Sequence, residues 1–448
     1  MLSDPIKKVL MVITIIIIFF LTAAAGHAQT LGICKTETGT GWLERSDQGD
    51  LILHLEGSYY DMGYQHGKLL EDEGRLSLRA IKTSIRKEMP LLPLPFVTWY
   101  LHTFIYKKQE PFIPGYFKEE MLGAADATGV SLRQLQAYHA LTYITSCATA
   151  AAWGQATKRG ELLFMRTNDT FFSVDPETKT MVQELGMIVI YRPLTGVPYM
   201  MISWPGYLGA SDGMNAEGIA VGNMSNRSKY ESPAGLPMMF RLKKTLNEAK
   251  TLEQAAVIMT QTPFGGGYNF IVADAKIPEA YVIEMDAKRA YIGAWNGAAE
   301  SNSYTFQGRK YTYEPTQGLL IRTNHPLSDE LIAHHEGSID ISDEYDCRSG
   351  PRYRVLRKGL LEQYGDLYVL NMLTTLRTFY QGLYQCQDDP CFVTTTHQMV
   401  LCPQNGDILI SFAKGNPDEE GLYRVSAYMQ DIHKYNFFEL LDRSSDQH

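Results

Sequence analysis

One cysteine, Cys147, lies between the polar pair Thr145–Ser146 and a run of small residues, in the stretch LTYITSCATAAAW. Small residues leave space around a side chain, whereas packed protein cores usually leave little. A thiol with open space beside it can attack a carbonyl carbon and carry an acyl group. We therefore take Cys147 as a candidate nucleophile, and the alternative is a buried structural thiol.

Charged and amide side chains follow in LLFMRTNDTFF, which contains Arg166, Asn168 and Asp169. The sequence between reads as a strand, the turn ATKRGE and a returning strand, and such a hairpin brings Arg166 back beside Cys147. An arginine next to a thiol lowers the thiol pKa and favours the thiolate. We expect Asp169 to hold the arginine through a bidentate pair, or to hold an amine. The alternative is a plain surface ion pair.

Later stretches supply more polar groups that could serve the same chemistry. Asn215 lies in GASDGMNAEGIAVGNM and Asn269 in GGGYNFIVAD, and an asparagine amide can donate a hydrogen bond to an oxyanion. Asparagine is also common at turns for structural reasons, so both interpretations stay open. RTNHP adds Asn324 and His325, and SGPRYRVL adds Arg352.

The elements that must position these residues change character at Cys147. From about residue 63 to 143 the sequence is mainly helical, with apolar residues at helical spacing and Pro-rich breaks. After Cys147, short apolar runs between Gly, Asn and Asp predict strands, with helices near 236–261 and 353–383. The chain finishes in a hairpin with a turn at Asn405–Gly406. This order favours an α+β layered sandwich in one mature domain, residues 29–448.

The composition is that of a globular protein with an acidic balance. The chain has 448 residues, of which 45% are apolar and 20% charged, and its formal net charge is −9. An acidic surface argues against nucleic acid or anionic lipid as the main partner, because both require clustered basic residues.

The N-terminus is typical of a secretory signal peptide. Lys7 and Lys8 precede an apolar run from Val9 to Leu21, and small residues follow up to Ala28. We expect cleavage after Ala28, a secreted or periplasmic protein, and no stable membrane span afterwards. The alternative is an uncleaved membrane anchor, although the run is short for a spanning helix.

Export would place six cysteines in an oxidising compartment. If Cys147 is a working thiol, five remain and at least one of them stays unpaired. Cys391 is close enough in sequence to pair with Cys386 or, across strands, with Cys402. The sequence does not choose between these pairings.

The order of these motifs resembles a known family. After the cysteine come WG-x-AT, G-x-LL-x-x-R-x-x-D, GMN-x-EG-x-AV, YN-x-x-VAD, TNHP and Ser-x-x-Arg, and GSYYDMGYQHG precedes it. This series resembles the penicillin (isopenicillin N) acyltransferase-like branch of the N-terminal nucleophile hydrolases, with choloylglycine hydrolases as more distant relatives. Thr167 stands where relatives usually carry asparagine, and Asn168 follows one position later.

The resemblance implies a fold and a mechanism. It implies a four-layer αββα sandwich, with two antiparallel sheets between helical layers. It also implies that the precursor cuts itself between Ser146 and Cys147, so that residues 29–146 form a mainly helical segment and residues 147–448 carry the nucleophile. The freed α-amine would then act as the base, because the pKa of such an amine, about 7.7–8.0 in peptides, suits proton transfer near neutral pH.

By the same resemblance, Arg166 and Asp169 orient the thiolate and the amine. Asn215 and Asn269 help to bind the oxyanion, and Arg352 supports the site.

We therefore expect an exported cysteine hydrolase or acyltransferase that cleaves the amide bond of a small N-acyl substrate through an acyl-enzyme, with no cofactor and no metal. The first alternative is a phospholipase-B-like or ceramidase-like lipid acyl hydrolase on the same fold. The second is a non-catalytic exported binding protein. A papain-like site that pairs Cys147 with His325 or His397 is a further alternative for the chemistry. The sequence does not give the oligomeric state.

Overall fold

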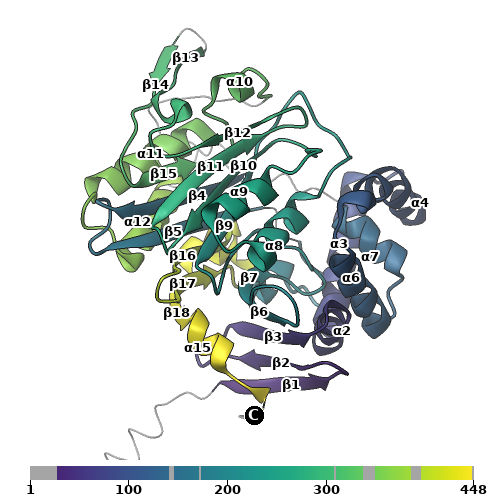
Figure 1. The fold of residues 1–448 in the computed structure, drawn as a ribbon. Coiled ribbons are helices and arrows are strands. Elements are labelled where there is room, and N and C mark those ends of the chain that lie inside the picture. Colours follow the sequence, from purple (N-terminus) through teal and green to yellow (C-terminus); the bar gives the residue numbers. More distant parts are fainter. Residues whose placement is uncertain are drawn as a thin grey trace, which may run out of the picture.

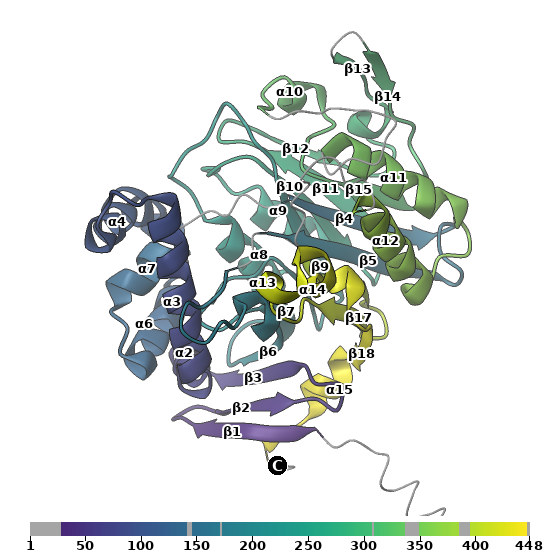
Figure 2. The ribbon, with the colours of Figure 1, turned by 180° about the vertical axis from the view of Figure 1, so that it is seen from behind.

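The computed structural model describes residues 28–140, 146–170, 173–306, 309–336, 349–384 and 395–445. Two β-sheets face each other, and helices cover the outer face of each sheet (Figures 1 and 2). These four layers confirm the α+β sandwich that the sequence predicts. The expected signal peptide and three of the six cysteines (Cys347, Cys386 and Cys391) lie outside the described residues.

The larger sheet has ten strands. In spatial order they are β1 (Gln29–Lys35), β2 (Thr40–Arg45), β3 (Leu51–Gly57), β6 (Met187–Pro193), β7 (Tyr199–Ser203), β8 (Asp212–Asn215), β9 (Ile219–Ser225), β10 (Tyr268–Asp274), β11 (Glu279–Met285) and β12 (Ala290–Gly293).

The smaller sheet has six strands, in the order β15 (Leu319–Arg322), β4 (Ser146–Gly154), β5 (Gly160–Asp169), β16 (Thr395–Cys402), β17 (Asp407–Phe412) and β18 (His433–Asn436). The predicted C-terminal hairpin is β16–β17, with Gly406 at a φ of 79° in its turn. A separate two-stranded hairpin consists of β13 (Ser303–Phe306) and β14 (Arg309–Thr312).

Much of the space between the two sheets is filled by apolar side chains. Phe164 and Met399 of the smaller sheet and Ile190, Met200 and Ile271 of the larger sheet belong to one buried cluster. Side chains alternate along each strand, so the same strands also supply the outer cores beneath the helices. Burial of this apolar area is the main force that holds the sheets together.

Helices α8 (Met238–Glu248) and α9 (Leu252–Met259) cover one part of the larger sheet, together with α2 (Tyr59–Leu69) and α6 (Gly115–Thr128). Helices α3 (Glu71–Glu88), α4 (Leu94–Tyr100), the π-helix η1 (Leu101–Tyr106) and α7 (Leu132–His139) extend this layer outward. As the sequence predicts for SLRQ, the Ser131 side chain caps α7 by accepting a hydrogen bond from the N–H of Gln134.

Helices α2 and α6 cross in backbone contact, and this explains one glycine of the GSYYDMGYQHG motif. A Cβ placed on Gly63 would lie 2.0 Å from the carbonyl oxygen of Glu120, and one on Gly123 would lie 2.0 Å from that of Tyr60. Both positions therefore require glycine for steric reasons.

Helices α11 (Ser349–Glu362) and α12 (Val369–Tyr384) cover the smaller sheet. The shorter helices are α5 (Lys107–Gln109), η2 (Glu110–Phe112), η3 (Val182–Leu185), η4 (Ala298–Ser301), α10 (Asp329–Ile332), α13 (Pro417–Glu420), α14 (Leu422–Val425), η5 (Ala427–Met429) and α15 (Phe437–Asp442). No helix within the described ranges combines the length and the apolar character needed to cross a membrane.

Within the N-terminal segment, residues 29–57 form the strands β1 to β3, which extend the larger sheet, and the helices follow from Tyr59 to His139. The sequence prediction needs one correction. The sheets are not purely antiparallel, because β3 pairs with β6 in parallel. A parallel pair needs a long crossover, and the whole helical segment together with the β4–β5 hairpin lies between these two strands.

Candidate active site

Cys147 occupies the second position of β4, between β15 and β5. It pairs with Asn168, and Thr149 pairs with Arg166. Ala148, Ala150 and Ala152 of the same strand pack under α11 and α12, whereas Ala151 and Trp153 face the inter-sheet core. Because side chains alternate along a strand, the fully buried Cys147 points toward the other sheet.

Arg166 returns beside Cys147, as the hairpin predicts. Its Nη2 lies 3.2 Å from Cys147 Sγ, 3.3 Å from Asn168 Oδ1 and 3.4 Å from Asn223 Oδ1. The thiol also donates to Asn168 Oδ1 at 3.6 Å. The guanidinium is fully buried, so its positive charge acts on the sulfur with little screening by water.

The acidic partner of Arg166 is Asp212. The predicted bidentate pair between Arg166 and Asp169 is therefore wrong, whereas the alternative role of Asp169, holding an amine, stays a prediction. Arg166 Nε lies 3.5 Å from Asp212 Oδ2, and the same oxygen lies 3.0 Å from His397 Nε2. Burial alone would lower the pKa of Arg166, but the neighbouring Cys147 and Asp212 outweigh it and raise that pKa. Burial alone would raise the pKa of Asp212, but His397 and Arg166 outweigh it and lower that pKa.

Asp169 lies on the opposite face of β5, because it is three positions after Arg166 and side chains alternate between faces along a strand. Its carboxylate accepts hydrogen bonds from Tyr380 Oη at 2.5 Å, Thr395 Oγ1 at 2.8 Å and Thr167 Oγ1 at 3.0 Å. Burial raises the pKa of Asp169, and the charge of Arg352 opposes this shift. Asp169 therefore fixes the end of β5 against α12, and β5 pairs it with Ser146.

Asn324 and Arg352 hold the main chain of the candidate nucleophile. Asn324 Oδ1 accepts the N–H of Cys147 at 2.7 Å, and Asn324 Nδ2 donates to the carbonyl oxygen of Ser225 at 2.6 Å. Arg352 donates to the carbonyl oxygen of Cys147 at 2.8 Å and to Asn324 Oδ1 at 2.6 Å. The predicted Arg352 therefore lies at the site. Asn324 of RTNHP also lies there, although the sequence predicted no specific role for it.

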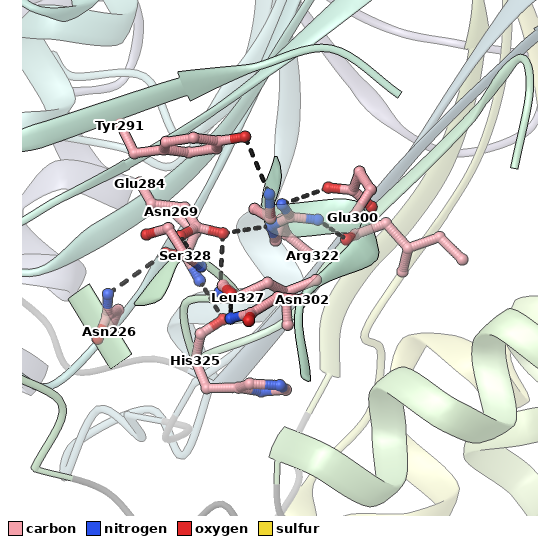
Figure 3. A network of polar contacts seen from close by, with 12 residues as sticks. Asn226, Asn269, Glu284, Tyr291, Glu300, Asn302, Arg322, His325, Leu327 and Ser328 are labelled. Atoms are coloured by element: carbon pink, nitrogen blue, oxygen red, sulfur yellow. Dashed lines mark hydrogen bonds and ion pairs between the residues drawn. The ribbon is translucent and has the colours of Figure 1, made fainter. Parts of the chain in front are cut away.

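A network of polar contacts fixes the loop that carries Asn324 (Figure 3). Asn269 Nδ2 donates to the carbonyl oxygens of Thr323 at 2.9 Å and His325 at 2.7 Å. The Glu284 carboxylate accepts the N–H groups of Leu327 at 2.8 Å and Ser328 at 2.9 Å. The predicted oxyanion donor Asn269 thus uses both amide hydrogens to position the residues on either side of Asn324.

Arg322 anchors the beginning of this loop. Its Nε lies 2.7 Å from Glu284 Oε1, and its Nη2 lies 2.5 Å from Glu300 Oε1 (Figure 3). All three side chains are buried, so the ion pairs are shielded from water.

Asn215, the other predicted oxyanion donor, stabilises the turn between β8 and β9 and links it to the end of α8. Its Nδ2 donates to the carbonyl oxygens of Leu246 at 2.9 Å and Ala249 at 2.8 Å, at the end of α8. Its Oδ1 accepts the N–H groups of Glu217 at 3.1 Å and Ile219 at 3.0 Å. Both amide hydrogens are therefore committed to main-chain carbonyls of the scaffold.

The papain-like alternative would pair Cys147 with His325 or His397, but both of these histidines form hydrogen bonds with other residues. His325 Nδ1 lies 2.7 Å from Ser349 Oγ and its Nε2 lies 3.3 Å from Tyr313 Oη, and burial holds the His325 pKa well below 6.5. His397 pairs with Asp212. Among the described residues, Cys34, Cys147 and Cys402 are free thiols, and the pairings predicted for Cys391 lie outside the described residues.

Comparison with known proteins finds a family whose model matches part of this chain. Residues 156–352 match the model of the family described as acyl-coenzyme A:6-aminopenicillanic acid acyl-transferase. This matched region contains Arg166, Asp169, Asn324 and Arg352, and it begins shortly after Cys147.

Curated relatives extend the likeness beyond this matched region. An uncharacterised protein of Archaeoglobus fulgidus is 25% identical over 392 residues, which cover 79% of this chain and 62% of that protein. Protein dcd1B of Dictyostelium discoideum is 24% identical over 259 residues, which cover 53% of this chain and 51% of that protein. The match thus spans between half and two thirds of the length of these relatives.

Distant likeness to solved structures accompanies these matches. Penicillin V acylase from Agrobacterium tumefaciens has a TM-score of 0.39 and 14% identity, over 65% of this chain and 91% of that chain. An N-acylethanolamine-hydrolyzing acid amidase ortholog from Caenorhabditis elegans has a TM-score of 0.38 and 14% identity, over 64% of this chain and all of that chain.

Proposed function

We propose that this protein is a cysteine amide hydrolase or acyltransferase of the N-terminal nucleophile type, with Cys147 as its nucleophile. The observation that carries the proposal is the contact of 3.2 Å between Arg166 Nη2 and Cys147 Sγ. A fixed, buried guanidinium stabilises the negative charge that a thiolate nucleophile needs. The match of residues 156–352 to the acyl-transferase family model supports the same class of chemistry.

In the proposed activation, the Cys147 thiol attacks the carbonyl carbon of Ser146. The peptide C–N bond breaks as a thioester forms, and water then hydrolyses the thioester to leave Cys147 with a free α-amine. Asn324 Oδ1, which accepts the Cys147 N–H at 2.7 Å, is placed to hold that amine afterwards. Arg352 keeps both Asn324 and the Cys147 carbonyl in position.

In the proposed turnover, the thiol passes its proton to the α-amine and the sulfur attacks the amide carbonyl of an N-acyl substrate. The C–N bond breaks, the departing amine takes the proton, and the acyl group stays on Cys147 as a thioester. Water or a second amine then accepts the acyl group and regenerates the thiol. The base and the nucleophile belong to one residue, so their proximity requires no separate histidine.

We also propose export, with cleavage after Ala28, from the N-terminal sequence pattern. The proposed substrate is a small N-acyl amide, and lipid acyl hydrolysis on the same site is the alternative substrate class.

Turnover of a panel of N-acyl amides, from short aryl-acetyl to long alkyl chains, tests this function. We expect hydrolysis by the wild type and none above background by Cys147→Ala. Hydrolysis of esters but of no amide would place the chain with the lipid acyl hydrolases. If Cys147→Ala hydrolyses the panel as fast as the wild type, Cys147 is not the nucleophile.

A further inference from the structure

The segment around α4 and η1 exposes apolar side chains that a folded core would normally bury. Leu91 is 92% exposed, and Phe96, Trp99, Tyr100 and Phe104 are between 41% and 47% exposed. The rings contact one another, with centroids 5.6 Å apart for Phe96–Trp99 and 5.3 Å apart for Trp99–Phe104. We call these five residues the aromatic face. Single exposed apolar residues are ordinary, but a contiguous patch marks an interaction surface.

The opposite side of the same helices is anchored. Val97 and Leu101 are buried in a small cluster with Ala137 of α7, and Ile85 and Ile105 pack against it. The helices thus have a conventional core side, and the aromatic face is their other side. Figures 1 and 2 both show α4 at the outer margin of the helical layer, away from the two sheets.

Basic side chains flank the aromatic face. Arg86 and Lys87 end α3, and Lys107 and Lys108 follow η1, and all four are exposed. Two acids lie near them: Glu88 is exposed, and Glu110 forms an ion pair of 2.7 Å with Lys107, so four basic side chains stand against two acidic ones. This local charge is positive although the whole chain carries −9, so the net charge is a poor guide to this surface.

We propose that the aromatic face docks this protein onto the surface of an anionic lipid bilayer. Tryptophan and tyrosine favour the depth of the lipid headgroups, and leucine and phenylalanine enter the acyl boundary. Lysine and arginine beside them attract anionic headgroups. The proposal concerns binding alone and stands independently of the proposed catalytic function.

The helix that leads into the aromatic face is fixed by a buried carboxylate, Asp175. Arg79 of α3 forms a bidentate pair with Asp175, with Nε–Oδ1 of 2.9 Å and Nη2–Oδ2 of 3.0 Å. This hydrogen-bonded guanidinium holds the pKa of the Asp175 carboxyl well below its usual range. The pair therefore holds α3, which leads into the aromatic face, against the body of the protein.

Sedimentation of the full chain with vesicles of phosphatidylcholine and phosphatidylglycerol tests the proposal. The variant is Leu91→Ser/Trp99→Ser/Phe104→Ser, and we expect its binding to fall by about tenfold or more, because its apolar contacts with lipid are lost. The matched control is Leu194→Ser/Val257→Ser/Ile277→Ser, which changes three residues that are 55–64% exposed on other elements. We expect this control to bind as the wild type does.

A second variant, Lys87→Gln/Lys108→Gln, should weaken binding to the anionic vesicles and leave binding to pure phosphatidylcholine unchanged. All variants share the same N-terminus, so any anchoring by Val9–Leu21 is common to them. Equal binding of wild type and the aromatic-face variant would overturn the proposal. So would a wild type that ignores vesicles and instead self-associates through this face in sedimentation velocity.

Discussion

Two fully buried arginines, Arg166 and Arg322, differ in how their charge is compensated. Arg322 has two carboxylates, Glu284 at 2.7 Å and Glu300 at 2.5 Å. Arg166 has one carboxylate at 3.5 Å, which it shares with His397, and its Nη2 faces Cys147 Sγ. A buried charge needs an opposite charge close by. The charge of Arg322 is therefore neutralised by its own two carboxylates. The charge of Arg166 is only partly neutralised, so it can stabilise a negative charge on the Cys147 sulfur.

The largest expected effect comes from Arg322→Met, which leaves two buried carboxylates without their partner. We expect the free energy of unfolding to fall by about 3–5 kcal/mol in urea titrations. Arg289→Met is the matched control, because Arg289 pairs with Glu330 at the surface and should lose at most about 1 kcal/mol. Equal losses for the two variants would contradict the scaffold role of Arg322.

Arg166→Met should lower activity more than it lowers stability. We expect kcat/KM for an N-acyl amide to fall about 100-fold, equivalent to about 2.7 kcal/mol, since the thiolate loses its counter-charge. Its unfolding free energy should fall by less than that of Arg322→Met. Arg166→Lys keeps the positive charge but lacks the planar set of guanidinium donors, and it should recover part of the activity. If Arg166→Met retains full activity in folded protein, the available charge has no catalytic use.

Both arginines stay charged at ordinary pH, so acid sensitivity should come from buried neutral histidines. His66 Nε2 and His139 Nε2 accept the N–H groups of Gly206 at 3.1 Å and Leu208 at 3.0 Å. Burial lowers the pKa of His66 to about 3 and that of His139 to about 4. The unfolded chain takes up these protons first, near pH 6.5, so stability is complete above that pH and declines as pH falls toward 4.

At pH 5 each of these histidines should cost about 2 kcal/mol of stability relative to pH 7. His139→Gln keeps an acceptor and removes one titration. Urea unfolding at both pH values should therefore show a smaller loss for this variant, by about 2 kcal/mol. An unchanged difference between pH 7 and pH 5 would mean that His139 is not held neutral.

The smallest expected effects concern two asparagines, Asn324 and Asn215. As with the two arginines, we expect the one beside Cys147 to affect activity and the other to affect stability. Asn324→Ala should lower kcat/KM about tenfold, because it releases the Cys147 N–H and the Arg352 contact. Asn215→Ala should instead lower the free energy of unfolding by about 1–3 kcal/mol and leave the kcat/KM of folded protein unchanged. Unfolding curves and initial rates on both variants distinguish these outcomes, and an activity loss in Asn215→Ala alone would reverse the assignment.

The sequence predicts well what depends on local pattern. The α+β layers, the C-terminal hairpin, the helices near 236–261 and the return of Arg166 to Cys147 follow from periodicity and turn chemistry. The partners of Arg166 follow from strand alternation, which puts Asn168 on its face and Asp169 on the other. The prediction paired the arginine with the nearest acid in sequence and did not apply that alternation.

The remaining differences depend on contacts between segments distant in sequence. Asp212 approaches Arg166 only because the two sheets pack face to face, and no local pattern indicates that pairing. Asn215, Asn269 and Asn324 all follow turn-like sequences, and only their partners separate scaffold amides from the one beside Cys147. The parallel pairing of β3 with β6 likewise depends on where a long helical crossover returns.

The central claim is that Cys147 becomes the first residue of a chain and then reacts through its own sulfur. Mass spectrometry of fully active protein, with N-terminal sequencing of each chain, tests it most directly. We predict a chain that begins at Cys147 and gains the acyl mass on that residue when substrate is trapped. An intact peptide across Ser146 and Cys147 in protein that turns over at its full rate would contradict the claim.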